Sequence, residues 1–350
     1  MHGDDMGVHN LINARMNKKD EFYTRYDTIA KEMPYASDVL HGKGILCNCD
    51  DPFLSEFVRY FINNFNTLGL KSLDSSCIDG GNGALHMRIT VVPEYMPDIP
   101  FDIGRRRKML DALLMIPGNS LEHLHDGGSF ESDECLAILD GCDVVVTNPP
   151  FSLARDFLDV VSGHNRNYLF LGNQNLITTA NATFLLLNKR LFIGASLHKG
   201  DVGFNVPEDY PMYGNKCFRD GSGNNVVHVT SIRWLTSYLY GIGSYAYDFS
   251  ARYHGHEEIY RFYDNYKAIN VPLTKLTPVD YKGVMGVPIT FLDRYDPDRF
   301  EIVGAATSSS LKRGYSKNVP INDGTKRGMA MIDGKYQYAK LFVVNRHVLE

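Results

Sequence analysis

The sequence predicts an α/β fold, in which a doubly wound, mostly parallel sheet is followed by a smaller mixed C-terminal domain. Apolar strand-like runs alternate with helix-like patterns from about residue 18 to residue 235. The run from Asp143 to Thr147 is rich in valine, which is typical of strands buried on both faces of a parallel sheet. Beyond about Val206 the sequence becomes rich in Gly, Tyr and Pro, and the alternation stops.

The length of the chain indicates more than one hydrophobic core. Its 350 residues exceed the usual size of a single core. We expect a loose polar arm over residues 1–17, a main α/β domain over 18–235, and a smaller domain over 236–350. The boundary near residue 235 rests on the change of composition alone.

The first elements establish the strand and helix order. A helix is predicted from about Asp27 to Met33. The apolar run 44–49 begins at a glycine and ends at Asp50-Asp51-Pro52, which favours a buried strand followed by a turn. The next helix has phenylalanines at intervals of four, giving one broad apolar face, at Phe53, Phe57, Phe61 and Phe65.

The later elements continue this alternation after an excursion. Residues 79–117 are rich in Gly and Pro and contain one strand-like piece, 86–92. Helices are predicted at 134–139, 153–161 and 182–187, and strands at 143–147, 168–171 and 191–195. In the C-terminal part, strands are predicted at 226–234, 289–292, 300–303 and 338–344.

Composition narrows the class of protein. The six cysteines have no paired C-x-x-C spacing and read as reduced core residues, so we predict no metal site. No apolar stretch of about eighteen residues is present, and we expect a cytoplasmic protein that does not bind a membrane.

A net charge of -5 is unusual for a protein that binds nucleic acid, because phosphates are contacted by Lys and Arg. Local basic runs would have to compensate. The candidate runs are Lys18-Lys19, Arg105-Arg106-Arg107-Lys108, Lys312-Arg313 and Lys326-Arg327. Each of them could instead be an ordinary solvated surface.

The strongest chemical signal is Asn148-Pro149-Pro150-Phe151, which follows the valine-rich strand directly. An exocyclic amine on a base is a poor nucleophile, because its lone pair is delocalised into the ring. The Asn148 side chain and the Pro149 main chain each offer a carbonyl oxygen to such an amine, and the prolines fix both in place. Phe151 offers a flat face on which a base can stack. The alternative interpretation is a plain strand-ending turn.

Residues that face a cofactor are predicted at the ends of other strands. Asp50 and Asp51 stand at the carboxyl end of the first strand, where ligands bind in doubly wound sheets. They accept hydrogen bonds and suit a cation, although either could simply cap the helix that follows.

Two aromatic and polar segments fit the same pocket. Phe22-Tyr23-Thr24 would place a ring against a cofactor, and Asp126 with Phe130 would place a carboxylate and a ring beside it. Each segment taken singly is also consistent with a structural role.

Taken together, these residues resemble the EcoRI-type adenine-specific DNA methyltransferases. The resemblance covers about residues 18–346. It is carried by Lys19-Asp20-Glu21-Phe22-Tyr23-Thr24, by Cys47-Asn48-Cys49-Asp50-Asp51-Pro52, by Val144 to Ser152, by Arg233-Trp234-Leu235-Thr236, and by Gly286 to Asp293.

The resemblance implies a class I methyltransferase sheet of the seven-stranded type and S-adenosyl-L-methionine as methyl donor. It implies N6 of adenine in double-stranded DNA as target, with Asn148 to Phe151 catalytic, and Phe22-Tyr23-Thr24 and Asp50-Asp51 in the cofactor pocket. Residues 236–350 would then be a DNA target-recognition region. A cognate restriction endonuclease sharing the site would be the functional partner, with no stable complex.

The sequence also departs from the family pattern. The glycine-rich turn after the first strand is absent, and no acidic residue for the ribose is obvious after the second strand, because Asp74 falls inside it. Two other functions therefore stay open. One is methylation of RNA or of a protein amide, and the other is a catalytically inactive DNA-binding relative.

Overall fold

A computed structural model describes residues 22–78, 83–198, 201–212, 216–241, 249–307 and 318–349, so the predicted arm at 1–17 lies outside it. The chain divides into two compact units. The first contains residues up to 173 and residues 196–240, and the second contains 174–195 and 241–350. The main domain was expected to be continuous over 18–235. Residues 174–195 instead group with the second unit, where α7 (Ala180–Leu187) packs against β15 (Phe300–Ala306).

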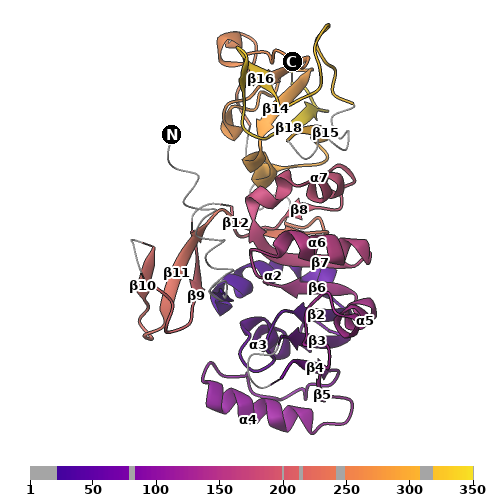
Figure 1. Cartoon of the computed structure of the whole chain (residues 1–350), viewed down its shortest axis with the longest axis vertical. Coiled ribbons are helices and arrows are strands. Elements are labelled where there is room, and N and C mark those ends of the chain that lie inside the picture. Colours follow the sequence, from indigo (N-terminus) through magenta and orange to yellow (C-terminus); the bar gives the residue numbers. More distant parts are fainter. Residues whose placement is uncertain are drawn as a thin grey trace. The chain divides into compact units, whose positions relative to one another are not determined.

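The first unit is built on a doubly wound, mostly parallel sheet, as the sequence predicts. Its strands lie in the order β5-β4-β3-β2-β6-β7-β12 (Figure 1). Neighbouring strands at the centre of this order are parallel. These central strands are β3 (Ser72–Cys77), β2 (Gly44–Asn48), β6 (Val144–Thr147) and β7 (Asn167–Asn173).

Antiparallel strands flank the parallel centre. On one side β4 (Leu85–Ile89) runs between β3 and β5 (Ser120–His123), and on the other β12 (Ile232–Thr236) pairs with β7. The prediction of one strand over 226–234 is wrong. Ser231 has a left-handed backbone with φ 61°, and this break separates β11 (Asn225–Thr230) from β12. The two strands therefore enter different sheets.

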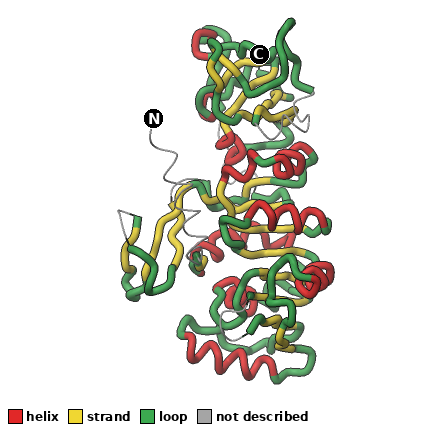
Figure 2. The backbone as a smooth tube through the Cα atoms, viewed as in Figure 1, coloured by secondary structure: helices red, strands yellow, loops and turns green. Residues whose placement is uncertain are grey.

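Helices cover both faces of the main sheet (Figure 2). The helices α2 (Tyr26–Leu40) and α3 (Glu56–Asn63) share one apolar core with Leu169 and Leu171 of β7. The alternate residue Phe170 packs against Phe157 of α6 (Ala154–Gly163), with ring centroids 5.5 Å apart. Because side chains alternate along a strand, this division places α6 on the opposite face. The helix α5 (Asp133–Gly141) precedes β6.

Two helices differ from the prediction. The helix α2 continues past Met33 to Leu40, although Pro34 lies inside it. A proline in a helix costs about 3 kcal/mol, but Ala36 and Leu40 are fully buried and extend the apolar face. Their burial offsets the lost hydrogen bond. The helix α4 (Ile103–Leu114) was not predicted, because four basic residues in a row obscure its apolar period.

A small antiparallel sheet completes the first unit, in the order β1-β9-β11-β10. It contains β1 (Tyr23–Thr24), β9 (Asp201–Asn205) and β10 (Cys217–Arg219). Thr24 lies directly opposite Phe204 in this sheet. The segment before α2 is thereby paired with a strand 180 residues further along the chain.

The second unit contains a four-stranded sheet in the order β13-β14-β18-β15. The prediction of a strand at 289–292 is wrong, since Ile289–Arg294 forms the 3-10 helix η4. Phe291 is fully buried against Phe249 and Phe300, so its apolarity reflects packing and not strand pairing. The other elements are η1 (Gln174–Thr178), β8 (Phe192–Ile193), η2 (Glu257–Ile259), β13 (Ala268–Asn270), η3 (Thr274–Leu276), β14 (Val284–Pro288), β16 (Met331–Ile332), β17 (Lys335–Tyr336) and β18 (Lys340–Asn345).

Candidate active site

The polar residues singled out in the sequence follow strands that end at one edge of the main sheet. Asp50 and Asp51 follow β2, and Asn148 follows β6, which is parallel to β2. Asp126 follows β5, which runs in the same direction because β4 is antiparallel to both of its neighbours. The carboxyl edge of a doubly wound sheet is where such folds bind their ligands.

The side-chain amide of Asn148 has a hydrogen-bonded nitrogen and an unpaired oxygen. Its Nδ2 donates a hydrogen bond of 2.7 Å to the main-chain carbonyl of Phe22. A carbonyl oxygen can only accept, so this contact fixes which end of the amide is nitrogen. The Asn148 Oδ1 atom is buried and has no partner among the described residues. A buried acceptor without a donor is costly, so a ligand or a water molecule is the expected partner of this oxygen.

Pro149 supplies a second acceptor next to it. The turn is fixed by the hydrogen bond from the Leu153 amide to the Pro150 carbonyl, at 2.8 Å. Within the described part of the chain, no donor reaches the carbonyl of Pro149. Because each proline has a fixed φ, the two carbonyl oxygens of Asn148 and Pro149 are set in place before any ligand arrives.

Aromatic rings gather against the same turn. The Phe151 ring stacks on the Phe22 ring, with centroids 5.4 Å apart and an angle of 25° between the planes. Phe204 presents its edge to both rings, at 5.5 Å from Phe151 and 5.9 Å from Phe22. The structure therefore places Phe22 against the Asn-Pro-Pro-Phe turn. Phe204 was missed, because the short strand β9 contains a glycine that weakens its alternation.

Asp50 ties the ends of β2 and β6 together. Its carboxylate accepts hydrogen bonds of 2.6 Å from the hydroxyls of Ser55 and Thr147. Thr147 immediately precedes Asn148, so this bond fixes the start of the Asn-Pro-Pro-Phe turn. Burial raises the pKa of the Asp50 carboxyl to about 7, although the two hydroxyls act in the opposite direction.

Asp51 and Cys49 shape the turn after β2. One carboxylate oxygen of Asp51 accepts from the amides of Phe53 and Leu54, at 2.8 and 3.1 Å, while Ser55 caps α3. Cys49 has a left-handed backbone, with φ 71°. This is the conformation that glycine adopts most readily. The turn thus has a backbone suited to glycine without containing one.

The segment Phe22-Tyr23-Thr24 contributes a second buried acceptor or donor. Thr24 is 6% exposed, and its Oγ1 has no hydrogen-bond partner within the described residues. Tyr23 alternates with it along β1 and is half-exposed. Thr24 lies two residues after Phe22, whose carbonyl holds the Asn148 amide. The unpaired oxygens of Thr24 and Asn148 are therefore both next to β1.

The Asp126 to Phe130 loop is packed against the end of β3. Glu134 accepts hydrogen bonds from the amides of His125 and Asp126, at 2.6 and 2.8 Å. A Cβ added at Gly128 would lie 2.2 Å from the Cys77 carbonyl oxygen, so the loop backbone touches the strand. Asp126 is exposed, whereas Phe130 is buried against Phe157 with centroids 5.3 Å apart.

One residue at this edge was missed altogether. Ile78 directly follows β3 and is 61% exposed, which is unusual for an isoleucine beside a buried strand. Asp74 lies inside β3, where its carboxylate is bound to His86 and Arg88 at 2.9 Å. Asp74 is therefore occupied with structural contacts, and Ile78 is the exposed apolar surface at the end of this strand.

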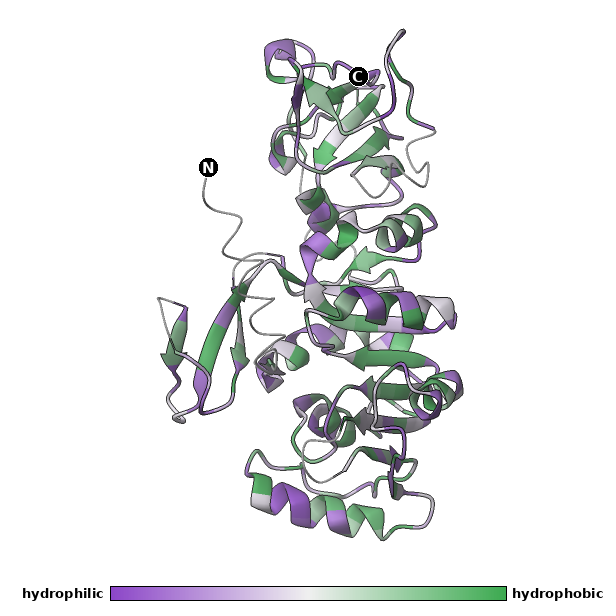
Figure 3. Ribbon diagram, in the orientation of Figure 1, coloured by the Kyte–Doolittle hydropathy of each residue, from purple (hydrophilic) through white to green (hydrophobic). Residues whose placement is uncertain are grey.

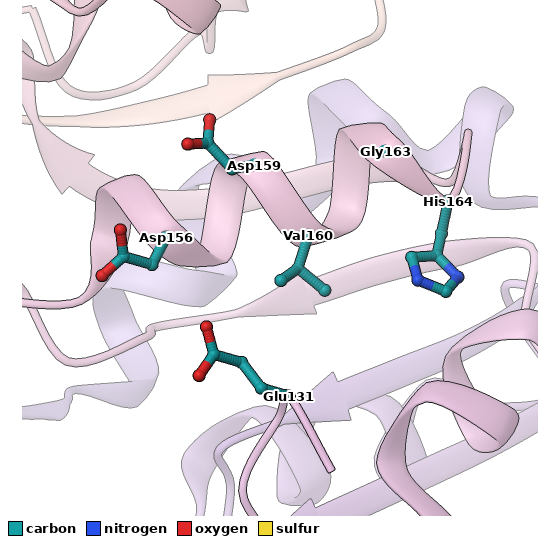
Figure 4. A pocket seen from close by; sticks show the side chains of 6 residues that line it. All are labelled: Glu131, Asp156, Asp159, Val160, Gly163 and His164. Carbon is teal, nitrogen blue, oxygen red and sulfur yellow. The ribbon is translucent and has the colours of Figure 1, made fainter. Parts of the chain in front are cut away.

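A shallow depression of about 510 Å³ lies elsewhere, on α6 (Figure 4). Its lining is acidic and includes none of the Asn148 to Phe151 residues, so it suits neither a phosphate nor the proposed chemistry. It is lined by Glu131, Asp156, Asp159, Val160, Gly163 and His164. In the described ranges, no group of three or more His, Cys, Asp or Glu residues is arranged to hold a metal, and no helix is long and apolar enough to cross a membrane.

Comparison with known proteins gives consistent matches over the whole chain. The family model described as adenine-specific methyltransferase EcoRI matches residues 10–346. The chain is 34% identical over 338 residues to the Type II methyltransferase M.EcoRI of Escherichia coli, covering 97% of each chain. It is 30% identical to M.MgeORF184P of Mycoplasma genitalium, covering 97% of this chain and 100% of the relative. It is also 30% identical to M.MpnI of Mycoplasma pneumoniae, with 97% and 99% covered.

Proposed function

The chain belongs to the EcoRI family of adenine-specific methyltransferases, and on this premise we propose that it methylates N6 of an adenine turned out of duplex DNA, with S-adenosyl-L-methionine as donor. The family and the named relatives make it a DNA methyltransferase. The observation that carries the finer proposal is the pair of unpartnered carbonyl oxygens at Asn148 and Pro149.

These two oxygens match the two hydrogens of an exocyclic amine. Accepting both hydrogens draws the amine lone pair out of conjugation with the ring and aims it away from the two carbonyls. When S-adenosyl-L-methionine is bound, it would supply a methyl group whose bond to the sulfonium sulfur breaks as the bond to nitrogen forms, and the nitrogen would then lose one of its two protons to water. The Asn148 amide stays oriented throughout, since its Nδ2 remains bonded to Phe22.

The aromatic rings provide the surface for the base. Phe22 now covers Phe151, and their stacking is worth about 0.5 to 1.5 kcal/mol. Stacking of a base on an aromatic ring is worth about 1 to 3 kcal/mol, so a base can compete with the Phe22 ring for this face of Phe151. The Asn148 amide is held by the main chain of Phe22, so the ring can turn aside without releasing it.

The residues at the sheet edge fit S-adenosyl-L-methionine as the donor. The unpaired hydroxyl of Thr24 suits a carboxylate or an amine of the ligand, and the left-handed backbone of Cys49 suits the turn after β2 for close approach by a ligand. Ile78 offers an apolar surface for an adenine ring, and Asp126 offers an exposed carboxylate. Asp51 keeps one carboxylate oxygen outside its contacts with the Phe53 and Leu54 amides.

Three of the predicted pocket residues act indirectly in this proposal. Asp50 uses both oxygens on hydroxyls, and Phe130 is buried against α6. We assign both to positioning of the site. Tyr23 faces outward on β1 and flanks the pocket without closing it.

We further propose that residues 236–350 contribute to DNA recognition. In this region the hairpin of β16 and β17 turns at Asp333-Gly334, and both turn amides donate to the Asp264 carboxylate, at 3.2 and 2.8 Å. This rigid hairpin carries Tyr336 and, just beyond it, Tyr338, which are 72% and 89% exposed. Exposed tyrosines on a fixed hairpin suit contact with bases or sugars in a groove.

A double variant tests that region. Y336A/Y338A is expected to weaken binding to duplex DNA and to blur sequence preference, while leaving affinity for S-adenosyl-L-methionine unchanged. The matched control is Y95A, which removes another highly exposed tyrosine, in the first unit. If the double variant and the control bind DNA equally well and with the same sequence preference, the two tyrosines do not contribute to DNA recognition.

The experiment for the main proposal identifies the methylated product. Purified protein, labelled S-adenosyl-L-methionine and mixed-sequence duplex DNA are incubated, and the DNA is digested to nucleosides for mass spectrometry. The expected label is on N6-methyl-2′-deoxyadenosine. Label on cytosine, or preferential label on competing RNA or protein, would overturn it. Calorimetric titration that detects no binding of the donor would support the inactive-relative alternative.

The resemblance also implies a genetic companion. We propose that a restriction endonuclease of the same site specificity accompanies this enzyme without a stable complex. Sequencing of methylated bases in a host that expresses the protein gives the site, and a nuclease tested on methylated and unmethylated copies of that site decides the matter.

A further inference from the structure

The helix α4 lies in the excursion between β4 and β5 and contains the run Arg105-Arg106-Arg107-Lys108. One member of the run is a structural anchor. Arg106 is 2% exposed, and its guanidinium forms an ion pair of 2.6 Å with Glu56 and a hydrogen bond of 2.9 Å to the Leu54 carbonyl. Burying this one arginine fixes the rotation of α4 about its own axis.

That rotation turns the other three cations outward. Successive residues of an α-helix are about 100° apart, so Arg105 and Lys108 lie about 60° apart on the side away from Arg106, and Arg107 lies on the other flank of the helix. All three are exposed, and no ion pair to any of them occurs among the residues that the structure describes. We call these three residues the α4 basic face. The basic half of α4 is drawn as hydrophilic in Figure 3.

The α4 basic face adjoins the catalytic edge of the sheet. The Arg107 guanidinium lies 4.6 Å from the centroid of the Phe53 ring. The amide of Phe53 is bound by Asp51, which belongs to the turn after β2. Arg106 reaches the carbonyl of the next residue, Leu54. The contacts of Arg106 and Arg107 therefore connect α4 to the turn after β2 at the candidate active site.

The arrangement of charge at this helix is unfavourable without a partner. Cations near the N-terminus of a helix oppose its dipole, by about 0.3 to 1 kcal/mol each. The N-cap Asp102 and the exposed Asp111 supply two carboxylates near the three exposed cations, whereas the buried Arg106 is paired with Glu56. Phe101 and Ile103 beside them are more than half exposed. Cations next to apolar side chains complement the phosphates and sugars of a nucleic-acid backbone.

We propose that the α4 basic face binds backbone phosphates of the DNA duplex beside the target base. This rests on the proposed function, and it gives a chain of net charge -5 a local positive surface at its catalytic edge. Contacts to phosphate position a duplex without reading its sequence. The α4 basic face therefore contributes affinity and salt dependence, and the same contribution applies to every DNA sequence.

The test compares two double variants of the full chain. R105Q/K108Q removes two charges from the α4 basic face and spares Arg107, which contacts Phe53. K43Q/K71Q removes two charges just before β2 and β3, at the opposite edge of the sheet. Affinity for a labelled mixed-sequence duplex is measured over a range of salt concentrations. Each phosphate contact contributes about 0.9 to the slope of log affinity against log salt.

The expected result is a slope smaller by about two in R105Q/K108Q and unchanged in K43Q/K71Q. The charge-retaining variant R105K/K108R should bind as the wild type does. Affinity for S-adenosyl-L-methionine should be equal in all four proteins, which shows that the fold is intact. Equal slopes in both double variants, with wild-type protein that binds and methylates DNA, would overturn the α4 proposal alone. Wild-type protein that binds no duplex DNA would overturn it together with the proposed function.

Discussion

The side-chain amide of Asn148 is held by the main-chain carbonyl of Phe22, at 2.7 Å from Nδ2 to the carbonyl oxygen. The two residues are 126 positions apart, so the segment before α2 sets the orientation of the Asn148 amide. The same bond leaves Asn148 Oδ1 as a buried acceptor without a donor.

The first prediction concerns the flat face of Phe151. Replacing Phe151 with Ala should lower the methyl-transfer rate about tenfold to a hundredfold, because a base loses about 1 to 3 kcal/mol of stacking. F151W should retain activity. The control is F218A, which removes a half-exposed ring from β10. Initial rates with labelled donor decide it, and equal rates in F151A and F218A would exclude stacking on this ring.

The second prediction follows from the pKa of Asp50, which burial raises to about 7. The folded state binds a proton more tightly than the unfolded state, whose carboxyl has a pKa of about 3.9. This contribution to stability is present below the unfolded pKa and is lost as pH rises through the folded pKa. Wild-type protein should therefore lose free energy of unfolding between about pH 4 and pH 7.

The D50N variant isolates this effect, since an amide keeps the shape of the carboxyl and does not ionise. The free energy of unfolding of D50N minus that of wild type should increase by about 2 to 3 kcal/mol between pH 5 and pH 8. Urea unfolding at several pH values measures this difference. A constant difference across the range would mean that the Asp50 pKa is not raised.

The third prediction compares two neighbouring glycines with left-handed backbones. Gly127 and Gly128 both have φ 74°, but a Cβ at Gly127 meets nothing within 4 Å, whereas one at Gly128 meets the Cys77 carbonyl. G127A should cost about 1 kcal/mol of unfolding free energy, and G128A about 3 kcal/mol. G128A should also weaken donor binding by displacing Asp126. Similar losses in both variants would contradict the packing against β3.

The fourth prediction concerns the turn after β2. The left-handed backbone of Cys49 costs about 1 kcal/mol for a residue with a side chain. C49G should therefore leave the unfolding free energy unchanged or raise it by up to about 1 kcal/mol. The control C47G, at a fully buried position in β2, should lower it by about 2 kcal/mol or more. A comparable loss in C49G would show that the side chain is needed for packing.

The sequence is informative where the signal is local. The valine-rich strand, the prolines and the asparagine that follows it are adjacent, so the turn at Asn148 could be predicted. The parallel order of β2 and β6 follows from alternation of strands and helices. The resemblance to a family added the expectation that distant segments share one pocket.

Contacts between distant residues could not be predicted in this way. The stacking of Phe22 on Phe151 and the edge contact of Phe204 depend on β1 pairing with β9. Arginine is usually exposed, but Arg106 is buried. For this reason the sequence predicted neither α4 nor the difference between the buried Arg106 and its exposed basic neighbours. The grouping of residues 174–195 with the second unit depends on packing of α7 against β15.

The most direct test of the account is methyl transfer by N148A. Loss of the Oδ1 acceptor should lower the rate about a hundredfold or more, as expected for removal of one preorganised polar contact to a reacting group. Affinity for S-adenosyl-L-methionine, measured by calorimetry, should change little, and the thermal unfolding midpoint should fall only slightly for one lost hydrogen bond. A transfer rate in N148A that matches the wild-type rate would contradict the activation of the amine by Asn148.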